Sequence, residues 1–230
     1  RSLILTPTRE LAAQIAENFE IYGKYHKLNM ALLIGGVSMV EQTKKLDRGV
    51  DVLIATPGRL LDHFERGRIL LNDIKILVID EADRMLDMGF IPDVERIVAL
   101  LPKIRQTLFF SATMAPKMEA LAKSMVRNPV RVAIAPEKPA VEVITQKVLY
   151  VHKKKKNDLL AYLLKDPGIK KAVVFTQMKH VANRVVKKLD AVGIRGTAIH
   201  GNKSQAARTK ALDGFKDGYY RVLVATDVAA

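Results

Sequence analysis

The alternation of two hydrophobic patterns constrains the fold of this chain most. Short apolar runs rich in β-branched residues alternate with stretches whose apolar residues recur at helical spacing. This order of strand and helix predicts parallel sheets wrapped by helices, an α/β fold. Because 230 residues exceed the usual size of one domain, about 100 to 150 residues, we expect two such units in tandem.

The expected elements fall into two series. Strands are predicted at residues 2–6, 30–34, 52–55, 76–80, 106–111 and 130–134, and then at 146–151, 171–175, 196–199 and 221–225. Helices are predicted at residues 9–24, 40–48, 58–66 and 116–125, and then at 156–164, 180–191 and 203–217. Each series has the pattern of a doubly wound unit.

A proline-containing segment separates the two series. Residues 135–140 hold two prolines and show no apolar periodicity, which is typical of an interdomain linker. The sequence therefore predicts a first domain at residues 1–135, a linker at 136–143 and a second domain at 144–230.

The net charge of +14 is unevenly distributed. Residues 1–135 hold 19 basic and 16 acidic residues, whereas residues 136–230 hold 19 and 8, so the second half carries +11 of the total. A strongly basic balance favours a polyanionic partner. Lysine runs such as residues 153–156 are also common on solvated faces, so charge alone is weak evidence for nucleic-acid binding.

The composition disfavours several classes of protein. The chain has no cysteine, which excludes disulfides and thiolate metal sites and fits a cytoplasmic protein. Its apolar runs are shorter than the roughly 18 residues that a membrane-spanning helix needs, so we expect a soluble protein with no membrane partner. The chain opens in an apolar run without an initiator methionine, and we expect it to be part of a longer protein.

Polar clusters follow five of the predicted strands. These clusters begin at Thr6, Ala55, Asp80, Ser111 and Thr226. In parallel sheets, functional residues gather where strands end at their carboxyl edge. We therefore expect the five polar loops to line one edge.

Three carboxylates stand directly after one predicted strand, at Asp80, Glu81 and Asp83. Their mutual repulsion is unfavourable unless a cation or hydrogen-bond donors compensate it. Asp80 is suited to hold Mg²⁺ through its water shell, and Glu81 to orient or deprotonate an attacking water. The alternative is a helix N-terminus at which carboxylates favour the helix dipole.

The polar clusters match, in identity and in order, the motifs of the DEAD-box family of ATP-dependent RNA helicases, and the resemblance covers nearly the whole chain. The matching segments are Pro7-Thr8-Arg9-Glu10-Leu11-Ala12-Ala13-Gln14 (motif Ia), Gly35-Gly36, Thr56-Pro57-Gly58-Arg59 (motif Ib), Asp80-Glu81-Ala82-Asp83, Ser111-Ala112-Thr113 (motif III), Val173-Val174-Phe175 (the start of motif IV), His200-Gly201 with Gln205 and Arg208, and Ala225-Thr226-Asp227-Val228-Ala229-Ala230 (motif V). The first half resembles the bacterial RhlE-like branch most. The resemblance implies two RecA-like parallel-sheet domains in tandem, both truncated, which use ATP and Mg²⁺ to remodel RNA.

The resemblance assigns catalysis to residues of the first half. Asp80 and Glu81 would bind ATP with Mg²⁺ and serve its hydrolysis. Asp83 would hydrogen-bond with Ser111 and Thr113 and so link the nucleotide state to strand separation. Simple turn formation is the alternative for the two hydroxyl residues.

The resemblance also assigns sequence-independent binding of the RNA backbone to residues in both halves. These residues are Arg9, Gly35, Gly36, Thr56, Gly58, Arg59, Gln205, Arg208 and Thr226. Glycines let the backbone approach, while hydroxyl and guanidinium groups donate to phosphate, so binding should depend strongly on salt. The alternatives are a plain turn for the two adjacent glycines, a helix start for Pro57-Gly58 and a surface ion pair for Arg208. Gln205, Arg208 and Thr226 would face either RNA or the domain interface.

The second half holds one residue on the nucleotide side and one departure from the family pattern. Asp227 would face ATP. Met178 stands where the family commonly has Thr or Ser, three positions after Phe175, so a hydroxyl contact to RNA is in doubt there, although Lys179 supplies charge. His200 is as well explained by packing at a strand end as by function.

Three family motifs are missing from the sequence: the adenine-recognising Q motif, the Walker A loop, and motif VI with its arginine finger. We therefore expect residues 1–230 alone to be inactive. The strand before a Walker A loop is expected in the middle of the sheet, and its loss should leave unpaired edges and an unstable first domain.

Two other functions remain open at the level of the sequence. In the first, a degenerate motor core binds RNA as a scaffold without hydrolysing ATP. Met178 and the missing motifs would support this alternative. A related DNA translocase would differ in the nucleic acid that stimulates ATP hydrolysis.

Overall fold

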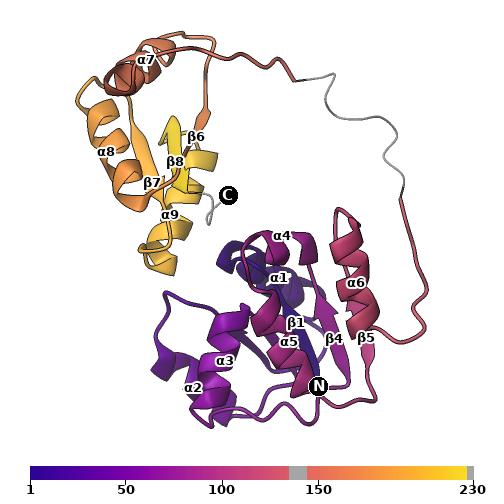
Figure 1. Ribbon diagram of the computed structural model, residues 1–230. Helices are drawn as coiled ribbons and strands as arrows, with labels where there is room; N and C mark the ends of the chain where they lie inside the picture. The colour runs from indigo at the N-terminus through magenta and orange to yellow at the C-terminus, as the bar shows by residue number, and fades with distance from the viewer. Residues whose placement is uncertain (135–143, 227–230) are drawn as a thin grey trace. The chain divides into compact units, whose positions relative to one another are not determined.

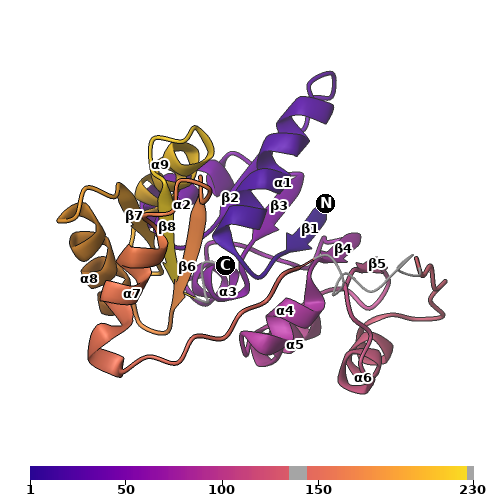
Figure 2. The same cartoon turned by 90° about the horizontal axis from the view of Figure 1, so that it is seen from above.

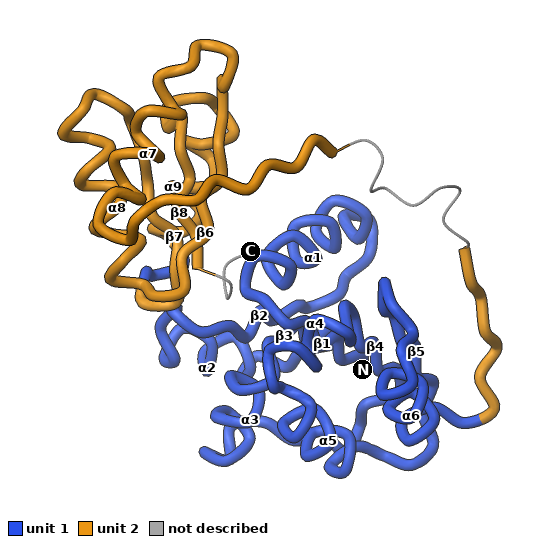
Figure 3. The backbone as a smooth tube through the Cα atoms, turned by 45° about the horizontal axis from the view of Figure 1, so that its top comes forward, with its two compact units in different colours: residues 1–127, 203–205 blue, residues 128–202, 206–230 orange. Residues whose placement is uncertain are grey.

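A computed structural model describes residues 1–134 and 144–226. The chain divides into two compact units, residues 1–127 with 203–205 and residues 128–202 with 206–230 (Figure 3). Each unit is described by itself. The expected linker at 136–143 lies outside the described residues, so the domain boundaries stay a prediction.

The first unit is built on a five-stranded parallel sheet, here called sheet A, with the strand order β2-β3-β1-β4-β5 (Figure 3). Figure 1 shows β1, β4 and β5 of this sheet. Its strands are β1 (Ser2–Leu5), β2 (Met30–Leu33), β3 (Val52–Ala55), β4 (Ile76–Ile79) and β5 (Gln106–Phe109). Every pair of neighbours is parallel. The strands are apolar on both sides, as a sheet covered on both faces requires.

Helices cover both faces of sheet A (Figure 2). They are α1 (Arg9–Tyr22), α2 (Met39–Asp47), α3 (Pro57–Glu65), α4 (Ala82–Asp87), α5 (Ile91–Ala99) and α6 (Pro116–Met125). Leu3 and Leu5 face the larger core, which holds residues of α3 to α6. Ile4 packs on the opposite side with Ala12 and Ala16 of α1. The alternation along β1 therefore fixes which helices lie on which face.

Short-range chemistry sets where several helices begin. Thr8 precedes α1, and its hydroxyl oxygen accepts a hydrogen bond from the Leu11 amide at 3.2 Å. Pro57 and Pro116 occupy the first turn of α3 and α6, where the missing amide hydrogen has no cost. In these three cases, the polar loop after a strand ends where a helix begins.

The second unit contains a three-stranded parallel sheet, here called sheet B, with the order β6-β8-β7. Its strands are β6 (Ala172–Thr176), β7 (Gly196–Ile199) and β8 (Val222–Thr226), and its helices are η2 (Lys153–Lys155), α7 (Lys156–Leu163), α8 (Lys179–Asp190) and α9 (Gln205–Lys216). One face packs on α7 and α8 and the other on α9.

Two predicted strands are wrong, and the helices α4, α5 and η2 were not predicted. Residues 130–134 and 146–151 have no strand, although both runs are rich in β-branched residues. Val130 is 90% exposed and Tyr150 is 98% exposed; without a neighbouring strand to pair with, β propensity does not make a strand. Helix α4 has six residues, too few for a clear apolar periodicity. Helix α5 does carry apolar residues at helical spacing, at Ile91, Val94, Ile97 and Val98, so its signal was present in the sequence and the prediction missed it. The other elements lie within two residues of their predicted ranges.

Sheet A is continuous from β2 to β5. Its outer strands, β2 and β5, each pair with one neighbour among the described strands, so the instability expected from a missing strand stays a prediction. Among residues 1–134 and 144–226, no helix is long and apolar enough to cross a membrane.

Candidate functional site

The strands of sheet A end level with one another. The paired final residues are Leu33, Ala55, Leu5, Ile79 and Phe109, in order across the sheet. The loops that follow therefore begin at one edge. Four of the five predicted polar loops are at this edge, together with the glycine loop after β2. The fifth, at Thr226, ends β8 in sheet B, so the expectation of five loops on one edge is wrong.

Arg9 and the two glycines lie together at this edge. A Cβ atom at Gly35 would lie 3.0 Å from Arg9 Nη2, and one at Gly36 would lie 2.5 Å from Arg9 Nη1. Gly36 also has a φ of +75°, which favours glycine. The glycines therefore leave room for the Arg9 guanidinium. This contact explains why glycine occupies both positions, which a plain turn alone would not require.

The loop after β3 is connected to the glycine loop. The Arg59 guanidinium, in the first turn of α3, donates from Nη1 to the Val37 carbonyl oxygen at 3.1 Å. Thr56 precedes α3, and its carbonyl oxygen accepts from the Leu60 amide. Gly58 has open space where a side chain would be, so packing gives no reason for glycine there.

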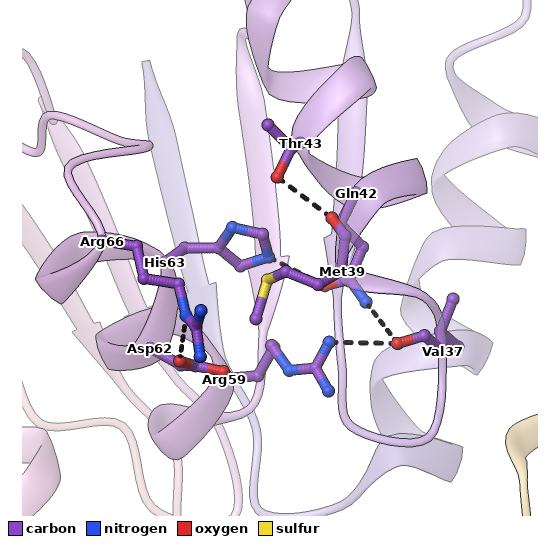
Figure 4. A network of polar contacts seen from close by, with 8 residues as sticks. All are labelled: Val37, Met39, Gln42, Thr43, Arg59, Asp62, His63 and Arg66. Carbon is purple, nitrogen blue, oxygen red and sulfur yellow. Dashed lines mark hydrogen bonds and ion pairs between the residues drawn. The ribbon is translucent and has the colours of Figure 1, made fainter.

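Two buried polar side chains support the glycine loop, and sequence reasoning missed both (Figure 4). Gln42 of α2 donates from Nε2 to the carbonyl oxygens of Ile34, at 3.0 Å, and Val37, at 3.4 Å. Its Oε1 lies 3.2 Å from Nε2 of His63 in α3. Gln42 is 2% exposed and His63 is fully buried. Polar residues on the buried faces of two amphipathic helices were the signal that could have revealed them.

The electrostatics of His63 follow from its burial. Burial lowers the pKa of His63 below its usual 6.5, and the neighbouring Arg59 and Arg66 guanidinium groups lower it further, while Asp62 opposes them. His63 is therefore neutral near pH 7.

The acidic loop, residues 80–83, follows β4. Asp80 accepts the Glu81 amide on Oδ1 at 2.9 Å. Glu81 has a φ of 50° and a ψ of 51°, a left-handed conformation that is uncommon for a residue other than glycine. The Ala82 amide donates to the Phe110 carbonyl oxygen at 3.0 Å, which connects this turn to the end of β5. The strained Glu81 backbone is typical of functional sites.

Asp83 joins the acidic loop to the loop after β5. Its Oδ2 accepts hydrogen bonds from the amide and the hydroxyl of Thr113, both at 2.9 Å, and its Oδ1 accepts from the Arg84 amide. Ser111 donates its hydroxyl to the Thr113 carbonyl oxygen at 2.7 Å. Burial raises the pKa of Asp83, but hydrogen bonds from Thr113 and from the Arg84 amide outweigh burial and hold that pKa below its ordinary value.

The acidic loop suits a cation held mainly by water and phosphate. Among the described residues, no group of three or more His, Asp or Glu side chains could enclose a metal ion. Mg²⁺ typically uses one or two carboxylates and takes its other ligands from water and substrate phosphates. Glu81 Oε2 is buried, lies 3.6 Å from Arg84 Nη1 and accepts no hydrogen bond from any residue in the described ranges. This oxygen has capacity to accept a hydrogen bond from a water molecule.

The predicted residues in the second half of the sequence belong to different elements. Gln205 begins α9, Arg208 lies in it and is 2% exposed, and Thr226 ends β8. The burial of Arg208 argues against a solvated surface ion pair. Lys179 donates to Asn202 Oδ1 at 2.9 Å. Asp227 lies outside the described residues.

Comparison with family descriptions identifies the chain. Residues 1–121 match the DEAD/DEAH box helicase family, and residues 154–230 match the helicase conserved C-terminal domain. The first match alone covers more than half of the 230 residues. The chain belongs to the DEAD-box RNA helicase family.

Curated relatives are similar over nearly the whole chain. The DEAD-box ATP-dependent RNA helicase 21 of Oryza sativa subsp. japonica is 42% identical over 245 residues, which cover 99% of this chain and 33% of that protein. The ATP-dependent rRNA helicase rrp3 of Emericella nidulans is 42% identical over 229 residues, 99% of this chain and 49% of that protein. The chain thus spans a third to about half of these relatives. Both are eukaryotic, and the expected likeness to the bacterial RhlE-like branch is not supported.

Solved structures share the fold. Dbp5 of S. cerevisiae bound to RNA and ADP BeF3 has a TM-score of 0.79 and 30% identity, over 99% of this chain and 58% of that one. A DEAD box protein from the hyperthermophile Methanococcus jannaschii has a TM-score of 0.54 and 36% identity, over 99% and 61%. The predicted fold class, two RecA-like parallel-sheet domains in tandem, is confirmed.

Proposed function

We propose that the chain is the core of an ATP-dependent RNA helicase, which couples ATP hydrolysis to clamping of RNA and local opening of short duplexes. One observation carries the proposal: the acidic loop and the Arg9, glycine and Arg59 group begin at the same edge of one parallel sheet. The printed names of the relatives include ATP-dependent RNA helicase, and one structural neighbour was solved with RNA and ADP BeF3. Both support the proposal.

The acidic loop would serve ATP hydrolysis. Mg²⁺, when bound, would neutralise developing phosphate charge. Asp80 would hold Mg²⁺ through water, and Glu81 would orient an attacking water and accept its proton. Asp83 would transmit the nucleotide state to the loop after β5 through Thr113 and Ser111. Asp227 lies in the matched motif of the second domain, and it would face the bound ATP.

The opposite half of the edge would bind RNA. Arg9, Gly35, Gly36, Thr56, Gly58 and Arg59 would contact the sugar-phosphate backbone, joined by Gln205, Arg208 and Thr226. Guanidinium groups and hydroxyls donate to phosphate without reading bases, so binding would be independent of sequence and sensitive to salt. Lys179 would supply charge where Met178 lacks a hydroxyl.

Two parts of the proposal extend beyond the site. The domain division at residues 1–135 and 144–230 is supported by the two compact units and the two family matches. A cytoplasmic location rests on the cysteine-free composition alone.

The test is RNA-stimulated ATP hydrolysis by the full-length natural protein and its Glu81→Gln variant. Loss of a positioned base lowers the rate about 100-fold or more, while RNA binding is retained. Glu95→Gln, an exposed carboxylate on α5, is the matched control and should hydrolyse ATP like the wild type. Wild-type protein that binds RNA without hydrolysing ATP would support the scaffold instead. Equal stimulation by DNA and RNA would support a translocase.

A further inference from the structure

His63 and Gln42 have no part in the proposed chemistry, yet both are buried beside it. His63 is fully buried in α3, and Gln42 is 2% exposed in α2 (Figure 4). Burying two polar side chains is unfavourable unless their hydrogen bonds serve the fold or a site. Their hydrogen bonds lead to the loop that carries Gly35 and Gly36.

The hydrogen bonds fix the orientation of both side chains. Gln42 Nε2 faces the carbonyl oxygens of Ile34 and Val37, which only accept hydrogen bonds. Its Oε1 therefore faces His63, so the His63 Nε2 atom carries the hydrogen and donates across the 3.2 Å gap. The other ring nitrogen, Nδ1, is buried and has no hydrogen-bond partner among the residues that the structure describes. His63 is thus a neutral donor held in one tautomer.

The anchored carbonyl groups stand on either side of the two glycines. Ile34 precedes Gly35, and Val37 follows Gly36. The Val37 carbonyl oxygen also accepts from Arg59 at 3.1 Å, so α2 and α3 both hold the same peptide group. A loop fixed at both ends keeps the glycines open to the Arg9 guanidinium, which lies against them.

We propose that His63 and Gln42 are positioning residues for RNA binding: His63 orients the Gln42 amide, and Gln42 holds the glycine loop in the conformation that presents Arg9 and Arg59 to the RNA backbone. This inference rests on the proposed function. It adds a pair of residues that touch no RNA themselves. Pre-organised loops bind more tightly because less conformational entropy is lost on binding.

A set of His63 variants separates positioning from packing. Glutamine carries an amide nitrogen near the place of His63 Nε2, whereas the shorter asparagine reaches only the place of Nδ1. Leucine fills the volume without a donor. In the full-length natural protein, His63→Leu and His63→Asn should raise the Kd for a single-stranded RNA oligonucleotide about tenfold, which corresponds to about 1.4 kcal/mol. His63→Gln should remain within about threefold of the wild type.

Steady-state kinetics supply a readout that a purely structural role would not move. His63→Asn should raise the RNA concentration for half-maximal ATPase stimulation, with kcat at saturating RNA and the KM for ATP unchanged. His26→Leu, at an exposed histidine after α1, should match the wild type throughout. If His63→Leu does not fold, the comparison of glutamine with asparagine decides the matter.

The outcomes distinguish the two proposals. RNA affinity that is equal in the wild type, His63→Asn and His63→Gln proteins overturns the positioning role and leaves the helicase proposal intact. Wild-type protein that does not bind RNA at all overturns the helicase proposal and the positioning role with it.

Discussion

The two halves of the carboxyl edge of sheet A are held in different ways. The glycine loop is held by hydrogen bonds from Gln42, which is itself bonded to His63. The two side chains are 2% and 0% exposed. The acidic loop is joined to the loop after β5 through Asp83 and Thr113, and Thr113 lies in solvent. The first connection is buried and the second is exposed, although their donor and acceptor atoms lie at similar distances.

This difference determines how readily each half can rearrange. Breaking a buried hydrogen bond leaves a desolvated polar group, at a cost of about 1–3 kcal/mol. Groups freed at an exposed position hydrogen-bond with water, so the net loss is about 1 kcal/mol or less. The glycine loop is therefore rigid, as the proposed RNA contact requires. The exposed connection is made and broken at low cost, as the proposed coupling to nucleotide binding requires.

The largest effect is expected from Gly36→Ala, compared with Gly49→Ala. Both glycines have a positive φ, +75° and +81°, so each alanine should lower stability by about 1–2 kcal/mol. At Gly36 the new Cβ would also displace the Arg9 guanidinium, whereas Gly49 has no atom within 4 Å. Only Gly36→Ala should weaken RNA binding, by about tenfold.

Fluorescence anisotropy with labelled RNA, alongside thermal unfolding, checks this comparison. Equal RNA affinities for the two alanine variants would mean that the glycine loop does not present Arg9, and the rigid half of the edge would lose its functional meaning.

A smaller effect is expected at the exposed half. Thr113→Val removes the hydroxyl donor to Asp83 and keeps the amide donor. The free energy of unfolding should fall by about 1 kcal/mol or less. The number of duplexes opened per ATP hydrolysed should fall by a few-fold, which corresponds to a coupling free energy on the order of 1 kcal/mol. Unwinding and ATPase assays on the same samples measure the ratio. A loss of stability well above that of the Gly49→Ala protein would contradict the contrast between the halves.

The smallest effect concerns pH. Burial lowers the pKa of His63 below 6.5 in the folded protein. As the pH falls through 6.5, the unfolded chain takes up a proton that the folded chain resists, so stability should decrease until the lower folded pKa is reached. At higher pH both states are neutral and the effect is absent. His63→Gln has no such group and should lose less stability between pH 7.5 and 5.5.

Urea unfolding of the wild type and of His63→Gln at several pH values gives the difference directly, because contributions from other groups largely cancel. His26→Gln, at an exposed histidine, serves as the control. If the free energy of unfolding changes with pH equally in all three proteins, burial does not lower the pKa of His63 and this prediction is wrong.

Much of the fold could be predicted from the sequence because the signals are local. The run before Thr6 is apolar, and a Thr cap or a Pro in the first turn marks the start of α1, α3 and α6. Strand propensity alone failed at residues 130–134, since a strand also needs a partner. The parallel order made the carboxyl edge predictable, and with it the place of Asp80, Thr113 and Arg59.

The sequence by itself therefore determined the class of fold, the family and the residue types at the sheet edge, because each depends on short segments that can be read in order. The tertiary structure alone decided that Gly36 makes room for Arg9 and that Gln42 and His63 hold the glycine loop. It also decided that the exposed residue Thr113 donates a hydrogen bond to Asp83. These pairs are brought together by packing of separate helices and strands, and their burial, which sets the strength of each bond, exists only in the folded chain.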